Sequence, residues 1–361
     1  MSTEGPDTPP DRAERAFAHL PHRTQIARMR QVAVAALAAY DLPPVRVRLL
    51  AHRFNTTFHV DTEGGARYVL RINRAGAPTV ETVGSELAWL AALRRDTALE
   101  VPAPVATRAG ALLTVADAPG VPHPHICVLF RWMPGHLSRH GLTPRRMERV
   151  GVLMAQLQDH ADHWERPPGF TRGRVDWPVA MGRTLPDPYG PEVVAYIEGL
   201  VAETLSAVEA APVTEALARV RAAVQALGQG PDAFGLIHAD LHYGNLLFSG
   251  DTVRAIDFDD CGFGFRLFDF GVMLSAVLDW PAYPALRAAL LAGYRRVRPL
   301  PAAHEAHLDA FIALRLVQDA LWILEWRRHP ALGADWAGQA REVLATLAAF
   351  LATGSVAPAG S

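Results

Sequence analysis

The chain has 361 residues, of which 50% are hydrophobic and 20% are charged, and its formal net charge at pH 7 is −2. This composition is typical of a folded globular protein and excludes a largely disordered chain. A net charge so close to zero gives no reason to expect a nucleic-acid partner. The length is sufficient for two lobes.

The sequence carries no signal for a membrane or for an oxidising compartment. No apolar run approaches the roughly 18 residues that a membrane span needs, and the polar, proline-rich start is unlike a signal peptide. The two cysteines, Cys127 and Cys261, make no disulfide framework. We therefore expect a cytoplasmic protein without a membrane partner, and a homodimer stays open.

The basic residues are unusual, because the 35 that are counted as lysine or arginine are all arginine. A Walker-A phosphate loop and a pyridoxal Schiff base both depend on a lysine, so both classes of site are excluded. A cation that holds phosphate in this protein has to be an arginine.

In chain order, a polar segment comes first, and we predict a flexible tail over residues 1–22. Apolar residues then recur at helical spacing and predict a helix over 24–40. Next the period changes to that of strands, and the Gly64-Gly65 pair predicts a hairpin turn between the second and third of them. These three strands are predicted at Val45–Leu50, Thr57–Asp61 and Tyr68–Ile72.

A second helix is predicted at Val80–Arg94, with an acidic residue in its first turn and basic residues in its last, as the helix dipole favours. Two further strands are predicted at Ala111–Val115 and His125–Phe130. Residues 23–132 should therefore form an N-terminal lobe with a mostly antiparallel sheet and one key helix.

The motif Met133-Pro134-Gly135 interrupts this pattern, and residues 133–352 are predicted to form a larger, mainly helical C-terminal lobe before a flexible tail at 353–361. An apolar island at 235–260, with two short β-like runs, interrupts the helices. The predicted fold class is α+β with two lobes. The helices of the second lobe are predicted at 143–160, 191–208, 212–227, 268–279, 283–297, 303–326 and 336–352.

The island at 235–260 also carries the polar residues with the clearest chemistry. It reads Leu236-Ile237-His238-Ala239-Asp240-Leu241-His242-Tyr243-Gly244-Asn245, and the strand that follows ends at Ile256-Asp257-Phe258. Leaving a buried polar group without a partner costs about 1–3 kcal/mol, so an Asp and an Asn between apolar strands need partners. A metal ion and a substrate hydroxyl would supply them.

The pattern H-x-D-x-x-x-x-N, followed by I-D-F, resembles the aminoglycoside phosphotransferase, choline kinase and type II homoserine kinase superfamily, which shares the protein-kinase fold. The likeness is specific at 236–269 and extends to the layout of 45–350. It implies an ATP- and Mg²⁺-dependent phosphotransferase, with 23–132 as its nucleotide-binding lobe and 133–352 as its catalytic and acceptor-binding lobe.

In the C-terminal lobe, the resemblance implies a catalytic role for Asp240, as the base toward an acceptor hydroxyl. His238 is the second residue assigned to catalysis, where it braces the loop. Asn245 and Asp257 would hold Mg²⁺, because that ion prefers hard oxygen ligands. Asp269 falls at the position of a structural aspartate that binds the backbone of the loop.

In the N-terminal lobe, Arg71 stands where the superfamily has its phosphate-binding lysine, and Glu86 matches the helix glutamate that pairs with that cation. Asn55 lies in the segment that would cover the phosphates, although this segment lacks the glycines of protein kinases. Arg131 and Met133 would offer backbone groups to the adenine edge. These five residues are the predicted ATP contacts.

The acceptor site is the least specific part of the prediction, and Asp260, Trp164, Arg174 and Trp177 are its candidates. The part of the C-terminal lobe between residues 135 and 235 lacks the dense acidic run that polycationic aminoglycosides would require. We therefore expect ATP and a small homoserine-, choline- or sugar-like hydroxyl acceptor. A protein Ser/Thr kinase and a nucleotide-binding regulator without catalysis remain as alternatives.

Overall fold

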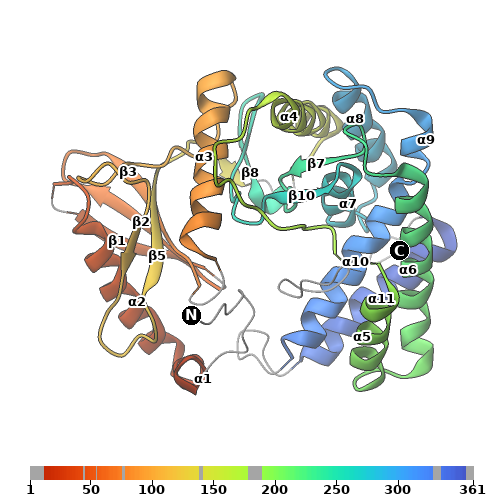
Figure 1. Cartoon of the computed structure of the whole chain (residues 1–361), viewed down its shortest axis with the longest axis horizontal. Helices are drawn as coiled ribbons and strands as arrows, with labels where there is room; N and C mark the ends of the chain where they lie inside the picture. Colours follow the sequence, from red (N-terminus) through yellow and green to blue (C-terminus); the bar gives the residue numbers. More distant parts are fainter. Residues whose placement is uncertain are drawn as a thin grey trace. The chain divides into compact units, whose positions relative to one another are not determined.

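The computed structural model describes residues 12–43, 45–53, 55–74, 78–137, 141–177, 189–327 and 335–354 (Figure 1). The contacts divide the chain into two compact units. The first comprises 1–134 together with 166–171, and the second comprises 135–165 together with 172–361. The predicted boundary between 132 and 133 therefore shifts to Pro134/Gly135, and the short segment 166–171 returns to the first unit.

The first unit consists of an antiparallel five-stranded sheet with the order β1-β2-β3-β5-β4 and three helices. The structure extends four of the predicted strands by one or two residues and places the fourth in chain order later than expected. The elements are α1 (Arg12–Ala18), α2 (His22–Leu37), β1 (Val45–His52), β2 (Thr56–Thr62), β3 (Arg67–Ile72), α3 (Val80–Asp96), β4 (Thr114–Ala116) and β5 (His125–Arg131).

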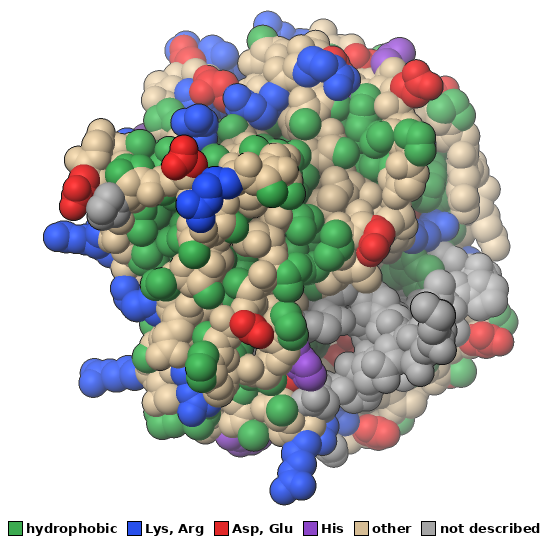
Figure 2. Space-filling view, turned by 60° about the vertical axis from the view of Figure 1, so that its left-hand side comes forward, with side chains coloured by type: hydrophobic (Ala, Val, Ile, Leu, Met, Phe, Trp, Pro, Cys, Tyr) green, Lys and Arg blue, Asp and Glu red, His purple; other side chains and the backbone are tan. Residues whose placement is uncertain are grey.

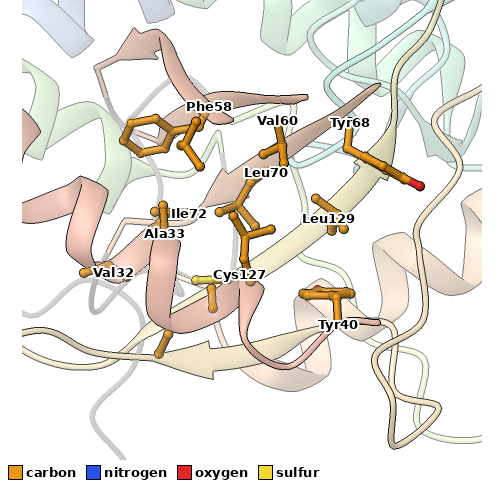
Figure 3. Close-up of a cluster of buried hydrophobic side chains, with 14 of the residues drawn as sticks. Val32, Ala33, Tyr40, Phe58, Val60, Tyr68, Leu70, Ile72, Cys127 and Leu129 are labelled. Carbon is orange, nitrogen blue, oxygen red and sulfur yellow. The ribbon is translucent and has the colours of Figure 1, made fainter. Parts of the chain in front are cut away.

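Strand alternation separates the two faces of this sheet. Alternate residues of a strand point to opposite faces, and Tyr68, Leu70 and Ile72 of β3 lie in a buried apolar cluster that β2, β5 and α2 complete (Figure 3). Arg71 and the residues in phase with it consequently face the opposite side. Packing α2 over one face thus determines which face remains for function.

Helix α3 begins with a reciprocal capping box. The Thr79 hydroxyl accepts the Thr82 N–H at 3.2 Å, and the Thr82 hydroxyl accepts the Thr79 N–H at 2.9 Å. Such a box satisfies two of the backbone donors that a helix start leaves open. Glu81 in the first turn and Arg94 in the last agree with the predicted polarity of this helix.

The second unit is mainly helical and contains two small sheets, with the orders β10-β7 and β6-β8-β9. Its apolar island holds most of the strands, as predicted. The elements are β6 (His136–Leu137), α4 (Pro144–His163), α5 (Pro191–Ala202), α6 (Ala207–Leu227), β7 (Phe234–Ile237), the 3₁₀ turn η1 (Tyr243–Asn245), β8 (Leu246–Ser249), β9 (Thr252–Ala255), β10 (Gly262–Phe265), α7 (Leu267–Ser275), α8 (Tyr283–Arg295), α9 (Ala302–Glu305), α10 (Leu308–Glu325) and α11 (Trp336–Thr353).

Several predicted helix boundaries in the second unit are wrong. Helix α5 ends at Ala202, and α6 begins at Ala207 because Ser206 and Glu209 form a capping box. Pro212 lies inside α6 and does not mark its start. The single helix predicted over 303–326 is divided into α9 and α10.

Part of each predicted tail can be compared with the structure. Residues 12–18 form α1, which corrects the flexible tail predicted for 1–22, and Thr353 is still helical. Residues 1–11 and 355–361 of those two predictions lie outside the described residues. In the part of the chain that the structure describes, no helix is long and apolar enough to cross a membrane. On the face shown in Figure 2, acidic and arginine side chains alternate among hydrophobic ones.

Candidate active site

The loop after β7 is anchored by Asp269 of α7. Its carboxylate accepts the N–H of Ala239 at 2.8 Å and the N–H of His238 at 3.4 Å. It also accepts the Gln158 amide at 3.0 Å. Asp269 is 1% exposed. Burial raises the pKa of Asp269, although the neighbouring His238 and these donors oppose the rise. The structure therefore places the Asp269 carboxylate against the backbone of the loop.

Backbone strain is concentrated at this loop. Ala239 has φ 70° and Asp257 has φ 65°, and they are two of the three non-glycine residues with positive φ among the described residues. This conformation costs an L-residue about 1–2 kcal/mol. Asp269 opposes that cost at Ala239 by binding its N–H. Strain of this kind, held in place by a buried acceptor, is common at functional sites.

The side chain of Asp240 is 21% exposed and receives three donors. Asn245 Nδ2 lies 2.7 Å from Oδ2, and His242 Nε2 lies 3.5 Å from the same oxygen. Arg315 of α10 reaches Oδ1 at 3.4 Å. Burial by itself would raise the pKa of Asp240, but the His242 hydrogen bond and the Arg315 charge outweigh it and hold that pKa below its ordinary value. The carboxylate is therefore ionised at neutral pH.

His238 is fully buried and connects the loop to the strand that follows. Its Nδ1 accepts the Asp240 N–H at 3.3 Å, so its Nε2 carries the proton and donates it to the Ile256 carbonyl at 3.2 Å. The ring packs against Phe258 with 4.5 Å between centroids. Burial lowers the pKa of His238 in spite of the nearby Asp269 and Asp240. His238 is therefore neutral, which suits a brace.

Asn245 and Asp257 are joined through one backbone bond, in which the Ile256 N–H donates to the Asn245 carbonyl at 2.9 Å. The Asn245 amide donates both to the Asp240 carbonyl, at 2.9 Å, and to its carboxylate, which turns the amide oxygen away from Asp240. Asp257 is exposed.

These two oxygen donors fit Mg²⁺, which binds through one or two protein carboxylates or carbonyls and takes its other ligands from water and phosphate. Within the described ranges, there is no group of three or more His, Cys, Asp or Glu side chains that could hold a metal ion.

Further carboxylates lie close to Asp240. Burial, together with the charges of Asp259 and Asp240, raises the pKa of Asp260 to about 8. Arg172 donates to the carbonyls of Cys261 and Asp259 and so holds the backbone around Asp260. The charge of Asp240 therefore acts on the carboxyl group of Asp260.

In the first unit, Arg71 and Glu86 form a buried bidentate pair. The distances are 2.9 Å from NH1 to Oε1 and 2.6 Å from NH2 to Oε2, and the side chains are 4% and 1% exposed. The Arg71 guanidinium also lies over the Phe130 ring, 5.4 Å from its centroid. The predicted pairing of these two residues is present. An arginine guanidinium is suited to bidentate binding of phosphate oxygens.

The face of the sheet that carries Arg71 also contains a hollow of about 450 Å³, and Trp132 is one of its walls. The His59 ring meets the Trp132 ring edge-on at 4.6 Å, and Asp61 pairs with His59 at 3.0 Å. The other lining residues are Arg48, Leu49, Leu50 and Arg67.

The remaining predicted ATP contacts differ in what they can offer. Asn55 Oδ1 accepts the Arg74 N–H at 3.2 Å and shapes the turn between β1 and β2. The Arg131 N–H donates to the Ala103 carbonyl at 2.9 Å and is therefore engaged within the first unit. Met133 follows β5 and is half-buried.

Three of the acceptor candidates, Arg174, Trp164 and Trp177, make contacts within the protein. Arg174 pairs with the fully buried Asp176 at 2.7 Å and lies over the ring of Phe234, so it supports the core of the second unit. Trp164 ends α4 and stacks on His160. The Trp177 carbonyl accepts the Gln318 amide of α10.

Three residues near Asp240 were not among the predicted site residues. His242 stood out only as a loop residue, yet its Nδ1 accepts the Gly244 N–H at 3.0 Å and so directs Nε2 toward Asp240. A side chain at position 244 would collide with that imidazole, which explains the glycine. Arg315 and Asp319 lie four residues apart on an apolar helix, and this spacing is the one sequence signal they carry.

Comparison with known proteins identifies the family. Residues 46–311 match the model of the phosphotransferase enzyme family. The homoserine kinase of Gluconobacter oxydans is 30% identical over 259 residues, which cover 68% of this chain and 73% of that protein. The solved structure of a microcompartment-associated aminopropanol kinase superposes with a TM-score of 0.73 at 32% identity, covering 91% of this chain and 98% of that one.

A more distant structure, the amicoumacin kinase hAmiN in complex with AMP-PNP, Ca²⁺ and Ami, superposes with a TM-score of 0.71 at 20% identity, covering 91% and 96% of the two chains. The predicted kinase-like fold and superfamily are confirmed by these matches, as is a phosphotransferase with an alcohol group as acceptor. The chain belongs to the phosphotransferase enzyme family.

Proposed function

We propose that this protein transfers the γ-phosphoryl group of ATP to the hydroxyl group of a small amino alcohol, with Asp240 as the base. The observation that carries the proposal is the ionised Asp240 carboxylate, which Asn245, His242 and Arg315 hold in one orientation. Among the relatives, homoserine kinase and aminopropanol kinase are named for small acceptors that bear a hydroxyl and an amino group.

In the proposed reaction, Asp240 accepts a hydrogen bond from the acceptor hydroxyl and thereby directs its oxygen at the γ-phosphorus. A bond forms between that oxygen and phosphorus, and the bond from phosphorus to the β–γ bridging oxygen breaks. The hydroxyl proton passes to Asp240, and ADP leaves. Phosphoryl transfer depends mainly on such positioning and on charge stabilisation.

Asn245 and Asp257 would hold Mg²⁺, which when bound neutralises charge on the phosphate oxygens. In the first unit, Arg71 would donate to the phosphates, while Glu86 fixes the plane of its guanidinium. The Arg131 carbonyl and the Met133 N–H would meet the adenine edge. The hollow beside Trp132 is on the sheet face that carries Arg71, which supports nucleotide binding there.

Asp260, near Asp240, is an acidic group with which the ammonium group of an acceptor would pair. Asp260 has a pKa of about 8 because it is buried beside other carboxylates. A nearby cation would favour its ionised form. This argues for amino alcohols over neutral sugars.

The test measures Mg²⁺-dependent ATP consumption with 1-amino-2-propanol, ethanolamine, choline, homoserine, a neutral sugar and a generic protein substrate. We expect turnover with an amino alcohol. Asp240→Asn should lower kcat by roughly 10²–10⁴-fold, with ATP binding retained in calorimetry. Asp251→Asn is the matched control, because Asp251 is 56% exposed and pairs with Arg145 at the surface.

Unchanged transfer by Asp240→Asn would rule out Asp240 as the base. Tight ATP binding by the unmodified protein, without turnover of any acceptor, would instead favour a regulator.

A further inference from the structure

Arg315 places a charged side chain in the middle of α10, a helix whose other residues are largely apolar and buried. Its Nε lies 3.0 Å from Oδ1 of Asp319, one helical turn later, and its NH2 lies 3.4 Å from Oδ1 of Asp240. The side chain is 24% exposed. A guanidinium held this far from water needs partners, and its two partners are a carboxylate of its own helix and the proposed base.

The donors around Asp240 occupy its two oxygens unequally. A carboxylate has about four acceptor positions, two on each oxygen. Asn245 and His242 both approach Oδ2, whereas among the residues that the structure describes Arg315 is the donor that approaches Oδ1. The hydrogen on His242 Nε2 is fixed there, because Nδ1 accepts the Gly244 N–H. The acceptor position that remains for a hydroxyl group is therefore on Oδ1, beside the guanidinium.

We propose that Arg315, held by Asp319, is a positioning residue for phosphoryl transfer: it fixes the carboxylate plane of Asp240 so that Oδ1 faces the acceptor hydroxyl. The proposal rests on the function proposed above, in which Asp240 is the base. Without Arg315, the bonds to Oδ2 remain, but rotation about the Cβ–Cγ bond is no longer restrained from the Oδ1 side. The geometry of attack then becomes less well defined.

The planar fork of arginine suits this position. Nε and NH2 lie on one edge of the guanidinium and can hold two carboxylates at once. A lysine ammonium is a point charge on a flexible stem and would orient Asp240 less well. A pair between two helices offers a comparison, because Arg287 of α8 is 25% exposed and pairs at 2.5 Å with Asp309, which is 51% exposed and lies at the start of α10.

The experiment compares Arg315→Ala, Arg315→Gln, Arg315→Lys and Asp319→Asn with the control Arg287→Gln. Steady-state kinetics are measured with ATP, Mg²⁺ and the best amino alcohol of the panel. Arg315→Ala and Arg315→Gln should lower kcat by about 10–100-fold, the order expected when a reacting group is slightly misplaced. KM for ATP should remain within about twofold, whereas Arg287→Gln should leave all parameters near those of the unmodified protein.

Two readouts separate positioning from a merely structural role. Added guanidinium ion should restore part of kcat in Arg315→Ala, in a saturable manner, and should not raise kcat in Arg287→Gln. Asp319→Asn should lower kcat less than Arg315→Ala, and the double variant should resemble Arg315→Ala, because both residues act through one contact.

A folded Arg315→Gln with the kcat of the control would overturn the inference and leave the proposed function intact. A loss of kcat with a raised KM for ATP, a lowered melting temperature and no rescue by guanidinium would also overturn it, by showing a structural role. If Arg315→Ala does not fold, Arg315→Gln and Arg315→Lys decide in its place. An unmodified protein that phosphorylates no alcohol would refute the proposed function itself.

Discussion

Removing the Asp269 carboxylate should loosen the catalytic loop, and the structure gives the size of the effect. In Asp269→Ala, the N–H groups of His238 and Ala239 lose their acceptor, and the Gln158 amide loses one of its two acceptors. A buried donor left without a partner costs about 1–3 kcal/mol. The raised pKa of Asp269 shows that burial disfavours its charge, so removing the carboxylate returns part of that cost.

We therefore expect Asp269→Ala to lower the free energy of unfolding by about 3 kcal/mol, the low end of the sum over three donors. Ala239, with φ 70°, would also lose the bond that holds its left-handed conformation, so kcat should fall as well. Asp269→Asn keeps one acceptor oxygen and should lose about half as much stability.

Equilibrium denaturation in urea, followed by tryptophan fluorescence, measures the shift in midpoint. Asp251→Ala is the control, because an exposed carboxylate with a surface partner should change stability by no more than about 0.5 kcal/mol. An Asp269→Ala midpoint equal to that of this control would refute the reasoning that the buried carboxylate holds the loop.

Three further predictions concern charge and packing. The folded protein keeps the Asp260 proton up to a pH of about 8, whereas an unfolded chain releases it near pH 4. The free energy of unfolding should therefore fall as the pH rises through this window. Asp260→Asn should show a smaller loss of melting temperature between pH 5 and pH 8.5 than the unmodified protein. Gly293→Ala should cost about 1–3 kcal/mol in denaturant titrations, because a Cβ there would collide with a carbonyl of α4, whereas Gly199→Ala in open space should be neutral or stabilising. Arg71→Ala should cost about 3–5 kcal/mol, because it leaves the Glu86 carboxylate buried without a counter-charge, and Glu86→Gln in addition should recover part of that loss; additive melting shifts would contradict the pairing.

The parts of the site that the sequence predicted are those defined over short distances along the chain. The loop from His238 to Asn245 and the residue Asp257 lie within one continuous motif, so their relation could be recognised from their spacing along the chain. Arg71 and Glu86 were assigned by their resemblance to the strand cation and the helix glutamate of the superfamily, and a buried cation needs an anion as partner.

Other features depended on three-dimensional neighbours and could not be read from local patterns. Arg315 approaches Asp240 from a helix far along the chain, and within α10 it resembles one half of an ordinary surface pair. Arg174 was assigned to the acceptor by its proximity to tryptophans, but Asp176, two residues later, neutralises it. The start of α6 is encoded locally by the Ser206 cap, although the helix was predicted to begin at residue 212.

The lowered pKa of Asp240 bears on how a base works at this site. Three donors to one carboxylate make it a weak proton acceptor, which would be unsuited to a step that begins with full deprotonation of an alcohol. Phosphoryl transfer passes through a loose transition state in which the attacking oxygen bonds little to phosphorus, so its proton is lost late. The oxygen becomes strongly acidic only as that bond forms, and even a weak base then accepts its proton. In the proposed mechanism, Asp240 therefore contributes chiefly orientation, and the donors that weaken it as a base are the same groups that hold it in place.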